Sequence, residues 1–342
     1  MLTGHVNPQT RTVTESLVVG VDAGATSSRV AVHTLDGTRV GYARAGAGNP
    51  SAHGLDKAVA AIGNALESAL PPGGGARVVA SLAGVAGLVQ EMEPELAKVW
   101  ARHGIAEGPR CMGDLAIAYA AGSAEPDGSL LLSGTGAAAA RLTGFELDAV
   151  ADAMGWLLGD TGSGFWIGRQ AAKAVIEALD RGLPVESLLP GSGHELVSLV
   201  GARFLGDERP ATPRAAAARI VRLAQADHMR LAALSPLVGQ AAEAGDPLAE
   251  GIVREAADHL VATLRRVHVS GPVVFAGSVL TNDGPVRRAV SELLAGERVA
   301  TAGDAAGAAS WLAGRDLLPD ADARSRHAAF TAASGSPPPA PR

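Results

Sequence analysis

The sequence predicts an α/β protein made of two similar lobes, the second of which carries a helical insertion. Three observations lead to this fold class. Short apolar runs that end in glycine turns alternate with stretches of helical periodicity. A strand–turn–strand pattern at Leu17–Leu35 returns at Ser129–Leu142, with Gly24 and Gly136 in matching places. The chain has 342 residues, which allows two domains at roughly 150 residues each.

The first lobe is expected over residues 16–121, after a flexible leader at residues 1–15. Leu17–Asp22 is an apolar run that ends on an acid. The next two strands, Arg29–Leu35 and Arg39–Ala43, are separated by Asp-Gly, a typical hairpin signal. Helices and strands then alternate: a helix at Leu55–Leu70, a strand at Val78–Leu82, a helix at Pro94–His103, a strand at Arg110–Met112 and a helix at Asp114–Gly122.

The second lobe is expected over residues 122–302. Its elements are strands at Ser129–Ser133 and Ala137–Leu142, an Ala- and Leu-rich helical insertion at residues 168–268, and an apolar strand at Pro272–Ala276. A closing helix follows at Asp304–Leu312. The chain ends in SGSPPPAPR, which cannot build a core, so residues 320–342 are predicted to form a disordered tail.

Composition and charge exclude several classes of function. Hydrophobic residues make up 47% of the chain and charged residues 19%, so a buried core is expected rather than global disorder. The net charge of −6 argues against a nucleic-acid-binding surface. No apolar stretch reaches the ~18 residues of a membrane span, and the polar N-terminus lacks the core of a secretory signal. We therefore expect a cytoplasmic protein without nucleic-acid or membrane partners.

Cysteine and lysine positions exclude further classes. The single cysteine, Cys111, allows no intrachain disulfide and no zinc site built on several thiolates. None of the three lysines follows a glycine, so the GxxxxGK[ST] phosphate loop is absent. The HRD and DFG signatures of protein kinases are absent too.

The first candidate site is the turn at Asp22–Thr26, directly after the first strand. Backbone N–H groups of Gly24, Ala25 and Thr26 could donate to phosphate oxygens. Asp22 could hold a magnesium ion through water. The same residues could instead form a plain hairpin turn in which glycine supplies a positive φ.

Two later segments have a similar character. Ser133–Gly136 is again a turn of small residues after a strand, with a hydroxyl at Thr135, and a hairpin turn is again the alternative. Phe275–Val279 ends a strand in Gly277 and Ser278, where an adenine could lie on the backbone. A simple strand-to-helix turn would explain the same residues.

Asp114 follows a short strand and opens a helix. A carboxylate in this place is often an N-cap, which alone would justify it. In a cleft, the same carboxylate could accept a proton from a substrate hydroxyl.

The segment Gly155–Gly168 has five glycines in fourteen residues, together with two tryptophans and an aspartate. Backbone donors, an acid and flat apolar faces suit a sugar. The alternative is an ordinary loop with aromatic anchors in the core, and Trp166 is expected to be such an anchor. Asp160 is the candidate functional residue.

These five segments, in this order, resemble the BadF/BadG/BcrA/BcrD-type ATPase and N-acetylglucosamine kinase family, within the actin–hexokinase–Hsp70 ATPase superfamily. The resemblance covers roughly Leu17 to Leu312, and its most specific part is the GDxGSGxWIG pattern at Gly159–Gly168. It implies two ribonuclease-H-like lobes with ATP in the cleft between them. It also implies that a helix within residues 303–318 returns to the N-terminal lobe.

The resemblance further implies an ATP- and Mg²⁺-dependent kinase that phosphorylates the 6-hydroxyl of an amino sugar, N-acetylglucosamine or glucosamine. Relatives are often homodimers. Asp114 matches the catalytic base. The implied ATP-binding positions are Gly24, Ala25, Thr26, Gly134, Thr135, Gly136, Gly277 and Ser278. The implied sugar-binding positions are Asn49, Asp114, Gly155 and Asp160.

The sequence departs from the family pattern around the acyl-group pocket. Relatives commonly have GGWG before a GDEG segment, whereas this chain has Met154 and a tryptophan, Trp156, displaced by two places. Thr161 replaces the glutamate, and Ala138 stands where an asparagine can contact the sugar. The sequence therefore leaves the identity of the sugar open.

Alternatives within the superfamily are also open. A regulatory or non-sugar ATPase would keep the phosphate loops but would not need a base at Asp114. A dehydratase activator holds an iron–sulfur cluster with two cysteines from each subunit, and the single Cys111 argues against that class. The CxCGxxGC motif of zinc-bearing sugar kinases is absent from the sequence.

Overall fold

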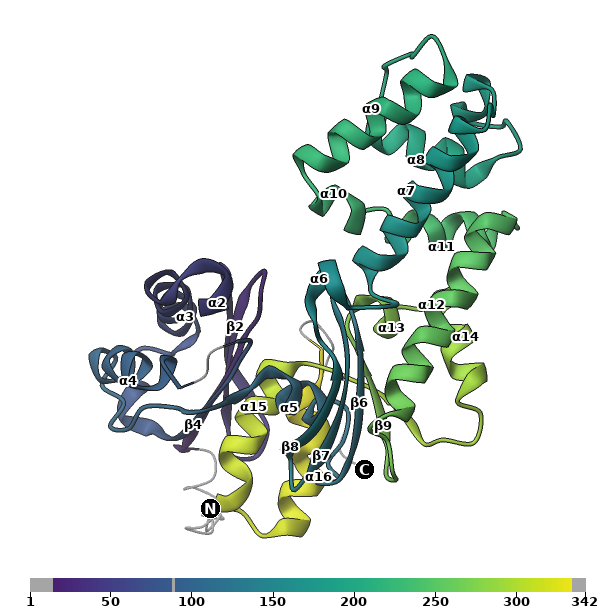
Figure 1. Ribbon diagram of the computed structural model, residues 1–342. Coiled ribbons are helices and arrows are strands. Elements are labelled where there is room, and N and C mark those ends of the chain that lie inside the picture. The colour runs from purple at the N-terminus through teal and green to yellow at the C-terminus, as the bar shows by residue number, and fades with distance from the viewer. Residues whose placement is uncertain (1–14, 88–89, 334–342) are drawn as a thin grey trace, which may run out of the picture. The chain divides into compact units, whose positions relative to one another are not determined.

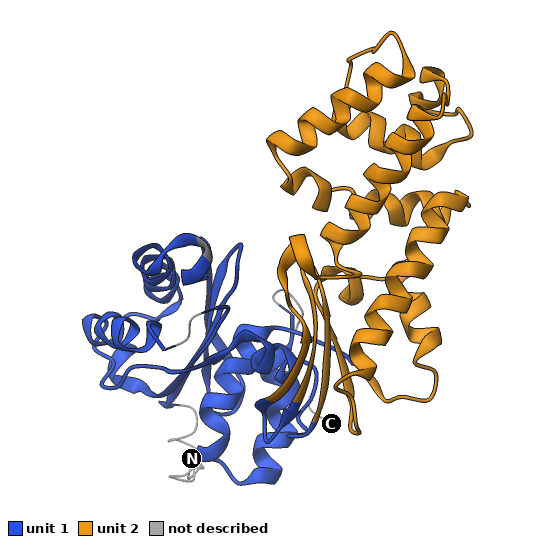
Figure 2. Ribbon diagram, viewed as in Figure 1, with its two compact units in different colours: residues 1–127, 142–147, 300–342 blue, residues 128–141, 148–299 orange. Residues whose placement is uncertain are grey.

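The computed structural model describes residues 15–87 and 90–333. The chain divides into two compact units (Figure 2). Unit 1 comprises residues 1–127, 142–147 and 300–342, and unit 2 comprises residues 128–141 and 148–299. The chain therefore passes from one unit to the other at four points along the sequence.

Unit 1 is built on a five-stranded mixed sheet. Its strands are β1 (Leu17–Ala23), β2 (Ser28–Thr34), β3 (Arg39–Ala45), β4 (Val78–Val85) and β5 (Arg110–Gly113). They lie in the order β3-β2-β1-β4-β5 (Figure 1). The first three strands pair antiparallel, whereas β1 with β4 and β4 with β5 pair parallel. The predicted strands of the first lobe are therefore present. Because β1, β4 and β5 run parallel, their carboxyl ends lie at the same edge of the sheet.

Helices cover both faces of this sheet. The helices are α2 (Pro50–His53), α3 (Leu55–Ala69), α4 (Met92–Arg102), α5 (Asp114–Ala120), α15 (Ala305–Gly314) and α16 (Asp320–Thr331), with short turns η1 (Gly75–Arg77) and η3 (Arg315–Leu317). On one face, Val19 and Val21 pack in a core with Ile62 and Trp100 of α3 and α4. On the other, α15 comes so close that a Cβ on Gly20 would lie 2.1 Å from its backbone. Glycine at this position permits the contact.

The second sheet repeats the topology of the first. Its strands are β6 (Gly128–Ser133), β7 (Ala137–Thr143), β8 (Glu146–Asp152), β9 (Val273–Ala276) and β10 (Val299–Thr301). They lie in the order β10-β9-β6-β7-β8, and β6 pairs parallel with β9. Reading this order backwards gives the connectivity of the first sheet. The repeat predicted from the two strand–turn–strand patterns is thus confirmed.

Unit 2 also contains the helical insertion. Its helices are α6 (Gly155–Leu158), α7 (Gly164–Asp180), α8 (Glu195–Leu205), α9 (Pro213–Ala226), α10 (Met229–Ala232), α11 (Ser235–Glu243), α12 (Pro247–Arg265), α13 (Ser278–Thr281) and α14 (Pro285–Leu293), with the turn η2 (Val185–Leu188). Buried residues of α7 and α12 form one core with Leu131 and Phe275 of the sheet. In the described part of the chain, no helix has both the length and the apolar character to cross a membrane.

The predicted disordered tail is wrong for its first part. Residues 320–331 form α16, which buries Ala323 and Phe330. The indole nitrogen of Trp311 donates to the carbonyl of Ala323 at 2.7 Å. The proline-rich composition that suggested disorder begins only at Pro337. Residues 334–342, and residues 1–14 of the predicted leader, lie outside the described residues.

Candidate functional site

The first predicted phosphate loop is an open turn at the end of β1. The N–H of Gly24 donates to Ser27 O at 3.0 Å, and its carbonyl accepts from the N–H of Gly48 at 3.0 Å. Within residues 15–87 and 90–333, the N–H groups of Ala25 and Thr26 have no protein acceptor, and both residues are exposed. Adjacent N–H groups of this kind can donate to a phosphate.

Asp22 shares the base of this turn with an arginine that sequence reasoning missed. Asp22 and Arg29 are register partners on β1 and β2. Arg29 Nη1 donates to Asp22 Oδ2 at 2.8 Å, while the Arg29 side chain keeps 41% of its surface exposed. Burial raises the pKa of Asp22, and the neighbouring guanidinium opposes that rise. Antiparallel pairing of the two predicted strands is the sequence feature that could have identified Arg29, because it places residues 22 and 29 opposite each other across the turn.

Asp114 is the first residue of α5, directly after β5. The N-cap of this helix is Gly113, so the predicted N-cap role belongs to its neighbour. The backbone N–H groups of Asp114 and Leu115, at the start of the helix, favour the ionised form of the Asp114 carboxyl and lower its pKa. Burial, followed by the charge of Asp22, nevertheless raises its pKa to about 6. The charges of the two half-buried carboxylates therefore influence each other at the edge where the parallel strands of unit 1 end.

Asn49 lies at the same edge. It precedes α2, and its Oδ1 accepts the N–H of Ser51 at 2.9 Å. A Cβ built on Gly87, just beyond β4, would lie 2.9 Å from that oxygen. Unit 1 thus brings Asn49 to the end of β4, with Asp22 and Asp114 at the ends of the neighbouring strands β1 and β5.

Unit 2 brings the second phosphate loop and the predicted adenosine motif together. A Cβ on Gly277 would lie 2.3 Å from the carbonyl oxygen of Ser133, so only glycine fits there. Gly277 also has a φ of 80°, which favours glycine. The N–H of Gly164, at the start of α7, donates to Gly134 O at 2.7 Å. Three segments that are distant in sequence therefore meet at residues 133–136.

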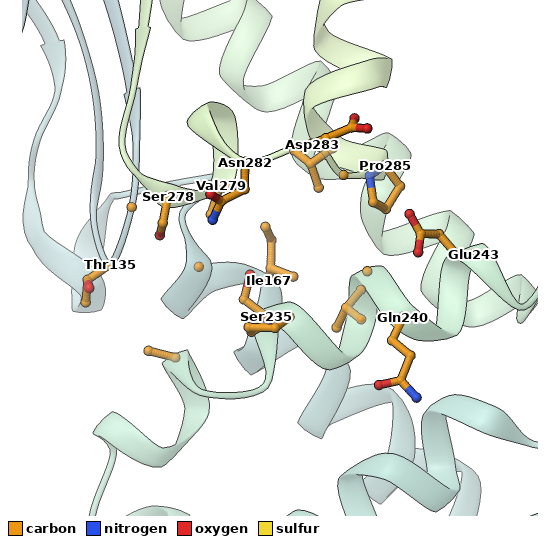
Figure 3. A pocket seen from close by; sticks show the side chains of 18 residues that line it. Thr135, Ile167, Ser235, Gln240, Glu243, Ser278, Val279, Asn282, Asp283 and Pro285 are labelled. Carbon is orange, nitrogen blue, oxygen red and sulfur yellow. The ribbon is translucent and has the colours of Figure 1, made fainter. Parts of the chain in front are cut away.

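A cavity of about 420 Å³ opens beside these loops, entirely within unit 2, and we call it the unit 2 cavity (Figure 3). Its volume lies in the range of about 300–1,000 Å³ that is typical of small-molecule sites. The predicted ATP-binding positions Gly134, Thr135 and Ser278 line one end. The other lining residues are Gly164, Ile167, Ala232, Ser235, Pro236, Val238, Gly239, Gln240, Glu243, Val279, Asn282, Asp283, Gly284, Pro285 and Val286.

The glycine-rich loop after β8 is held by a second aspartate that the sequence did not reveal. Asp152 Oδ1 accepts the N–H of Asp160 at 2.8 Å, and Oδ2 accepts the N–H and hydroxyl of Thr161, each at 3.0 Å. These hydrogen bonds lower the pKa of Asp152. Burial raises the pKa of Asp160, and the backbone N–H groups of Ala137 and Gly155 oppose that rise. A Cβ built on Gly136 would lie 2.8 Å from Asp160 Oδ2, so the Asp160 carboxylate lies against the second phosphate loop.

Aromatic residues of this loop differ in exposure. Trp166 is 4% exposed, as expected for a core anchor. Trp156 lies on α6 with its ring stacked on His228, with a centroid distance of 4.7 Å. Its neighbours Leu157 and Leu158 are strongly exposed.

The carboxylates of unit 1 suit a magnesium ion that arrives with phosphate. Magnesium usually binds through one or two carboxylates together with substrate phosphates and water. Burial raises the pKa of both Asp22 and Asp114, which means that each gains from a nearby cation. Among the described residues there is no group of three or more His, Cys, Asp and Glu side chains that could form an all-protein metal site. The donor set therefore fits an ion that also takes ligands from outside the protein, such as phosphate oxygens.

The sequence model of the BadF/BadG/BcrA/BcrD ATPase family matches residues 19–309. Among solved structures, a proposed N-acetylglucosamine kinase from Chromobacterium violaceum matches with a TM-score of 0.62 and 23% identity, over 87% of this chain and 99% of that chain. A proposed N-acetylglucosamine kinase from Porphyromonas gingivalis has a TM-score of 0.59 and 18% identity, over 92% and 98%.

A ROK family glucokinase from Streptomyces griseus, solved with glucose and AMPPNP, has a TM-score of 0.52 and 20% identity, over 89% of this chain and 99% of that chain. At these identities the likeness establishes a shared fold. Together with the repeated sheet topology, it confirms the predicted actin-like ATPase fold.

Proposed function

The chain belongs to the BadF/BadG/BcrA/BcrD ATPase family, and from this premise we propose that it is an ATP-dependent sugar kinase. We further propose that it phosphorylates the 6-hydroxyl of an amino sugar, N-acetylglucosamine or glucosamine. The observation that carries the proposal is the pairing of Asp114 with Asp22 at one buried edge of unit 1, where the pKa of Asp114 rises to about 6. The fold shared with sugar kinases supports the same conclusion.

Asp114 would be the general base. A carboxyl with a pKa of about 6 is ionised at pH 7, yet it is basic enough to take a proton in the transition state. Asp114 would accept the proton of the sugar hydroxyl as its oxygen bonds to the γ-phosphorus of ATP. The bond from that phosphorus to the β–γ bridging oxygen breaks, and ADP leaves. Such a reaction depends mainly on positioning and on charge stabilisation.

The turn after β1 would hold the transferred phosphoryl group. The N–H groups of Ala25 and Thr26 are free to donate to its oxygens. When bound, magnesium would supply positive charge to the phosphates, with Asp22 as its carboxylate ligand, directly or through water. Arg29 is close enough to Asp22 to bond it at 2.8 Å, so it would supply a second positive charge beside the same phosphates.

The unit 2 cavity would take the nucleoside. Its phosphate end is formed by Gly134, Thr135 and Ser278, and its middle by apolar side chains such as Ile167 and Val286. A polar end beside an apolar slot matches a nucleotide, in which phosphate, ribose and base follow one another.

We propose Asn49 as a contact of the acceptor sugar in unit 1. For Asp160 and Gly155 in unit 2, sugar binding stays a prediction from the family resemblance. The side-chain amide of Asn49 lies at the same strand edge as Asp114. The Asp160 carboxylate lies against Gly136, and its roughly four lone-pair sites give it acceptor capacity for a ring hydroxyl.

The experiment that tests this proposal is a coupled ADP-release assay with Mg·ATP and a sugar panel. The panel contains N-acetylglucosamine, glucosamine, N-acetylmannosamine, N-acetylmuramic acid and glucose, with a no-sugar control. We expect ADP release that depends on an amino sugar and disappears in Asp114→Asn. Asp56→Asn is the matched control, because Asp56 is an exposed carboxylate on α3 of the same unit. Mass spectrometry of the product locates the phosphate.

Other outcomes separate the alternatives. ADP release without any sugar dependence would replace the kinase with a non-sugar ATPase. ATP binding without ADP release would favour a regulatory nucleotide-binding protein. Dependence on glucose alone would keep the kinase and remove the amino-sugar assignment.

A further inference from the structure

Different residues line the two ends of the unit 2 cavity. Thr135 and Ser278 lie at the end beside the second phosphate loop, whereas Pro285 and Glu243 lie toward the opposite end (Figure 3). Asn282 lies on the wall from which Ser278 also projects. A ligand whose phosphates rest on residues 133–136 therefore meets Ser278 first and Asn282 next.

Backbone geometry fixes this order. A Cβ built on Gly134 would lie 3.8 Å from the N atom of Ser278, so α13 starts against the phosphate loop. The N–H of Asn282 donates to Ser278 O at 3.4 Å, which places Asn282 one helical turn further on. Residues four apart in a helix present their side chains on the same face, at Cβ separations of about 5–6 Å.

At the far end of the cavity, one arginine is paired with two carboxylates. Arg288 Nη2 binds Glu243 Oε1 at 3.0 Å, and its Nη1 binds Asp283 Oδ1 at 3.3 Å. The Asn282 side chain, by contrast, is exposed where it lines the cavity, and its carboxamide makes no hydrogen bond within the described part of the protein, so a ligand there would meet it open to solvent. A carboxamide can accept through its oxygen and donate through its nitrogen at the same time. A pair of neighbouring hydroxyls is the matching ligand chemistry.

We propose that Asn282 is a specificity-determining residue that binds the ribose diol and selects ribonucleotides over 2′-deoxyribonucleotides. Its side-chain oxygen would accept the 2′-hydroxyl, and its nitrogen would donate to the 3′-oxygen. The inference rests on the proposed function only in taking the ligand to be a nucleoside phosphate. It adds a prediction about how the ribose of the nucleotide is recognised, and this prediction does not depend on which alcohol is phosphorylated.

The test is calorimetric binding of ADP and of 2′-deoxyADP to the full chain, without any acceptor sugar. We expect the wild type to bind ADP about tenfold more tightly than 2′-deoxyADP, the size of effect that a lost neutral hydrogen bond produces. In Asn282→Ala, ADP loses the hydrogen bonds to both ribose oxygens, whereas 2′-deoxyADP loses only the one to its 3′-oxygen. Affinity for ADP should therefore fall about tenfold more than affinity for 2′-deoxyADP, so that the preference for ADP disappears.

Two further variants sharpen the result. Asn282→Asp keeps an acceptor for the 2′-hydroxyl and should retain part of the preference for ADP. Gln225→Ala removes an exposed carboxamide from α9 of the same unit, outside the cavity, and should leave both affinities unchanged. Thermal melting of each variant shows that it is folded.

Equal binding of the two nucleotides by the wild type would overturn the inference, as would an equal loss of both affinities in Asn282→Ala. Either result with sugar-dependent ADP release intact leaves the kinase proposal standing. Selective ADP binding without sugar-dependent turnover would instead keep the inference and remove the kinase. Failure to bind any nucleotide would remove both.

Discussion

Asp114 illustrates how one residue acquires its chemistry from its surroundings. Burial and the charge of Asp22 raise its pKa to about 6, and a base must be deprotonated to work. We therefore expect kcat/KM for the sugar to fall about tenfold per pH unit below an apparent pKa of about 6. A pH–rate profile of the wild type checks this limb. Asp114→Asn should lower kcat by about 10²–10⁴-fold.

A flat profile between pH 5 and pH 7 would contradict the role of Asp114. Retention of nucleotide binding in Asp114→Asn, measured by calorimetry, separates loss of the base from loss of the fold.

Arg29 is the cation that unit 1 places beside its phosphate loop. Replacing it in Arg29→Met removes a charge-assisted hydrogen bond of about 1.5–3 kcal/mol, so kcat should fall about 10- to 100-fold. Arg44→Met is the matched control, because Arg44 is the exposed register partner of Arg29 on β3. Steady-state kinetics of both variants, at saturating Mg·ATP, give the comparison. Equal activity of the two variants would exclude an electrostatic role for Arg29.

The candidate residues could be predicted where the chemistry is local in sequence. Asp22 and Gly24 stand out because a strand runs directly into a turn of small residues. Arg29 could not be ranked, since its importance depends on strand register rather than on a motif. Asp152 was missed for a similar reason, because its role depends on hydrogen bonds to residues eight and nine positions further along.

At the scale of elements, α16 packs against the first sheet, where its Phe330 contacts the buried His33. His33 of β2 is fully buried, neither ring nitrogen has a hydrogen-bond partner among the described atoms, and its ring lies 4.8 Å from that of Phe330. Burial, followed by the charge of Arg39, lowers the pKa of His33 from 6.5 to about 3. The native state therefore excludes a proton that the unfolded chain accepts readily.

This shift predicts acid sensitivity. The stability that neutral His33 contributes is complete above pH 6.5 and is lost as the pH falls toward 3. At pH 5 the free energy of unfolding has fallen by about 2 kcal/mol. Chemical denaturation of wild type and His33→Leu at pH 5 and pH 7.5 measures the difference. The variant should lose less stability on acidification than the wild type does. An identical pH dependence in both proteins would show that His33 is not the group responsible.

Phe330 gives a direct measure of what α16 contributes. Its side chain is 1% exposed, and Phe330→Ala should lower the free energy of unfolding by about 3–5 kcal/mol. Leu317→Ala serves as the control, since Leu317 is 52% exposed on η3. Guanidinium denaturation of both variants would decide whether α16 is integral to unit 1. A loss below about 1 kcal/mol in Phe330→Ala would assign α16 a peripheral role.

Elements with an apolar run or a clear helical periodicity could be predicted from the sequence, whereas β8 and α16 could not. β9 is buried throughout and reads VVFA, and β1 is buried and apolar except at Asp22 near its end. β8 is largely exposed and reads ELDAVAD, which gives little hydrophobic signal. α16 has few apolar residues, and its buried side chains are fixed by contacts with distant segments such as Trp311.

At the scale of the whole molecule, the resemblance to kinases of this family predicts a homodimer. Light scattering on the purified protein should then give twice the chain mass of 34.3 kDa. A mass equal to one chain at micromolar concentration would contradict this prediction. The measurement is best repeated with Mg·ATP and the sugar, because ligand binding shifts any association that favours the bound state.

Because the chain returns to unit 1 only after most of unit 2, ribosomal synthesis separates the two parts of unit 1 in time. The strands of the first sheet leave the ribosome early, but the helices α15 and α16 that cover one of its faces follow about 200 residues later, which is roughly 10–40 s at about 5–20 residues per second. During that interval the nascent sheet carries an uncovered apolar face that is prone to aggregation. Ribosome-associated chaperones would be needed most while unit 2 is being synthesised. For the same reason, a gene fragment that stops before residue 331 should yield insoluble protein.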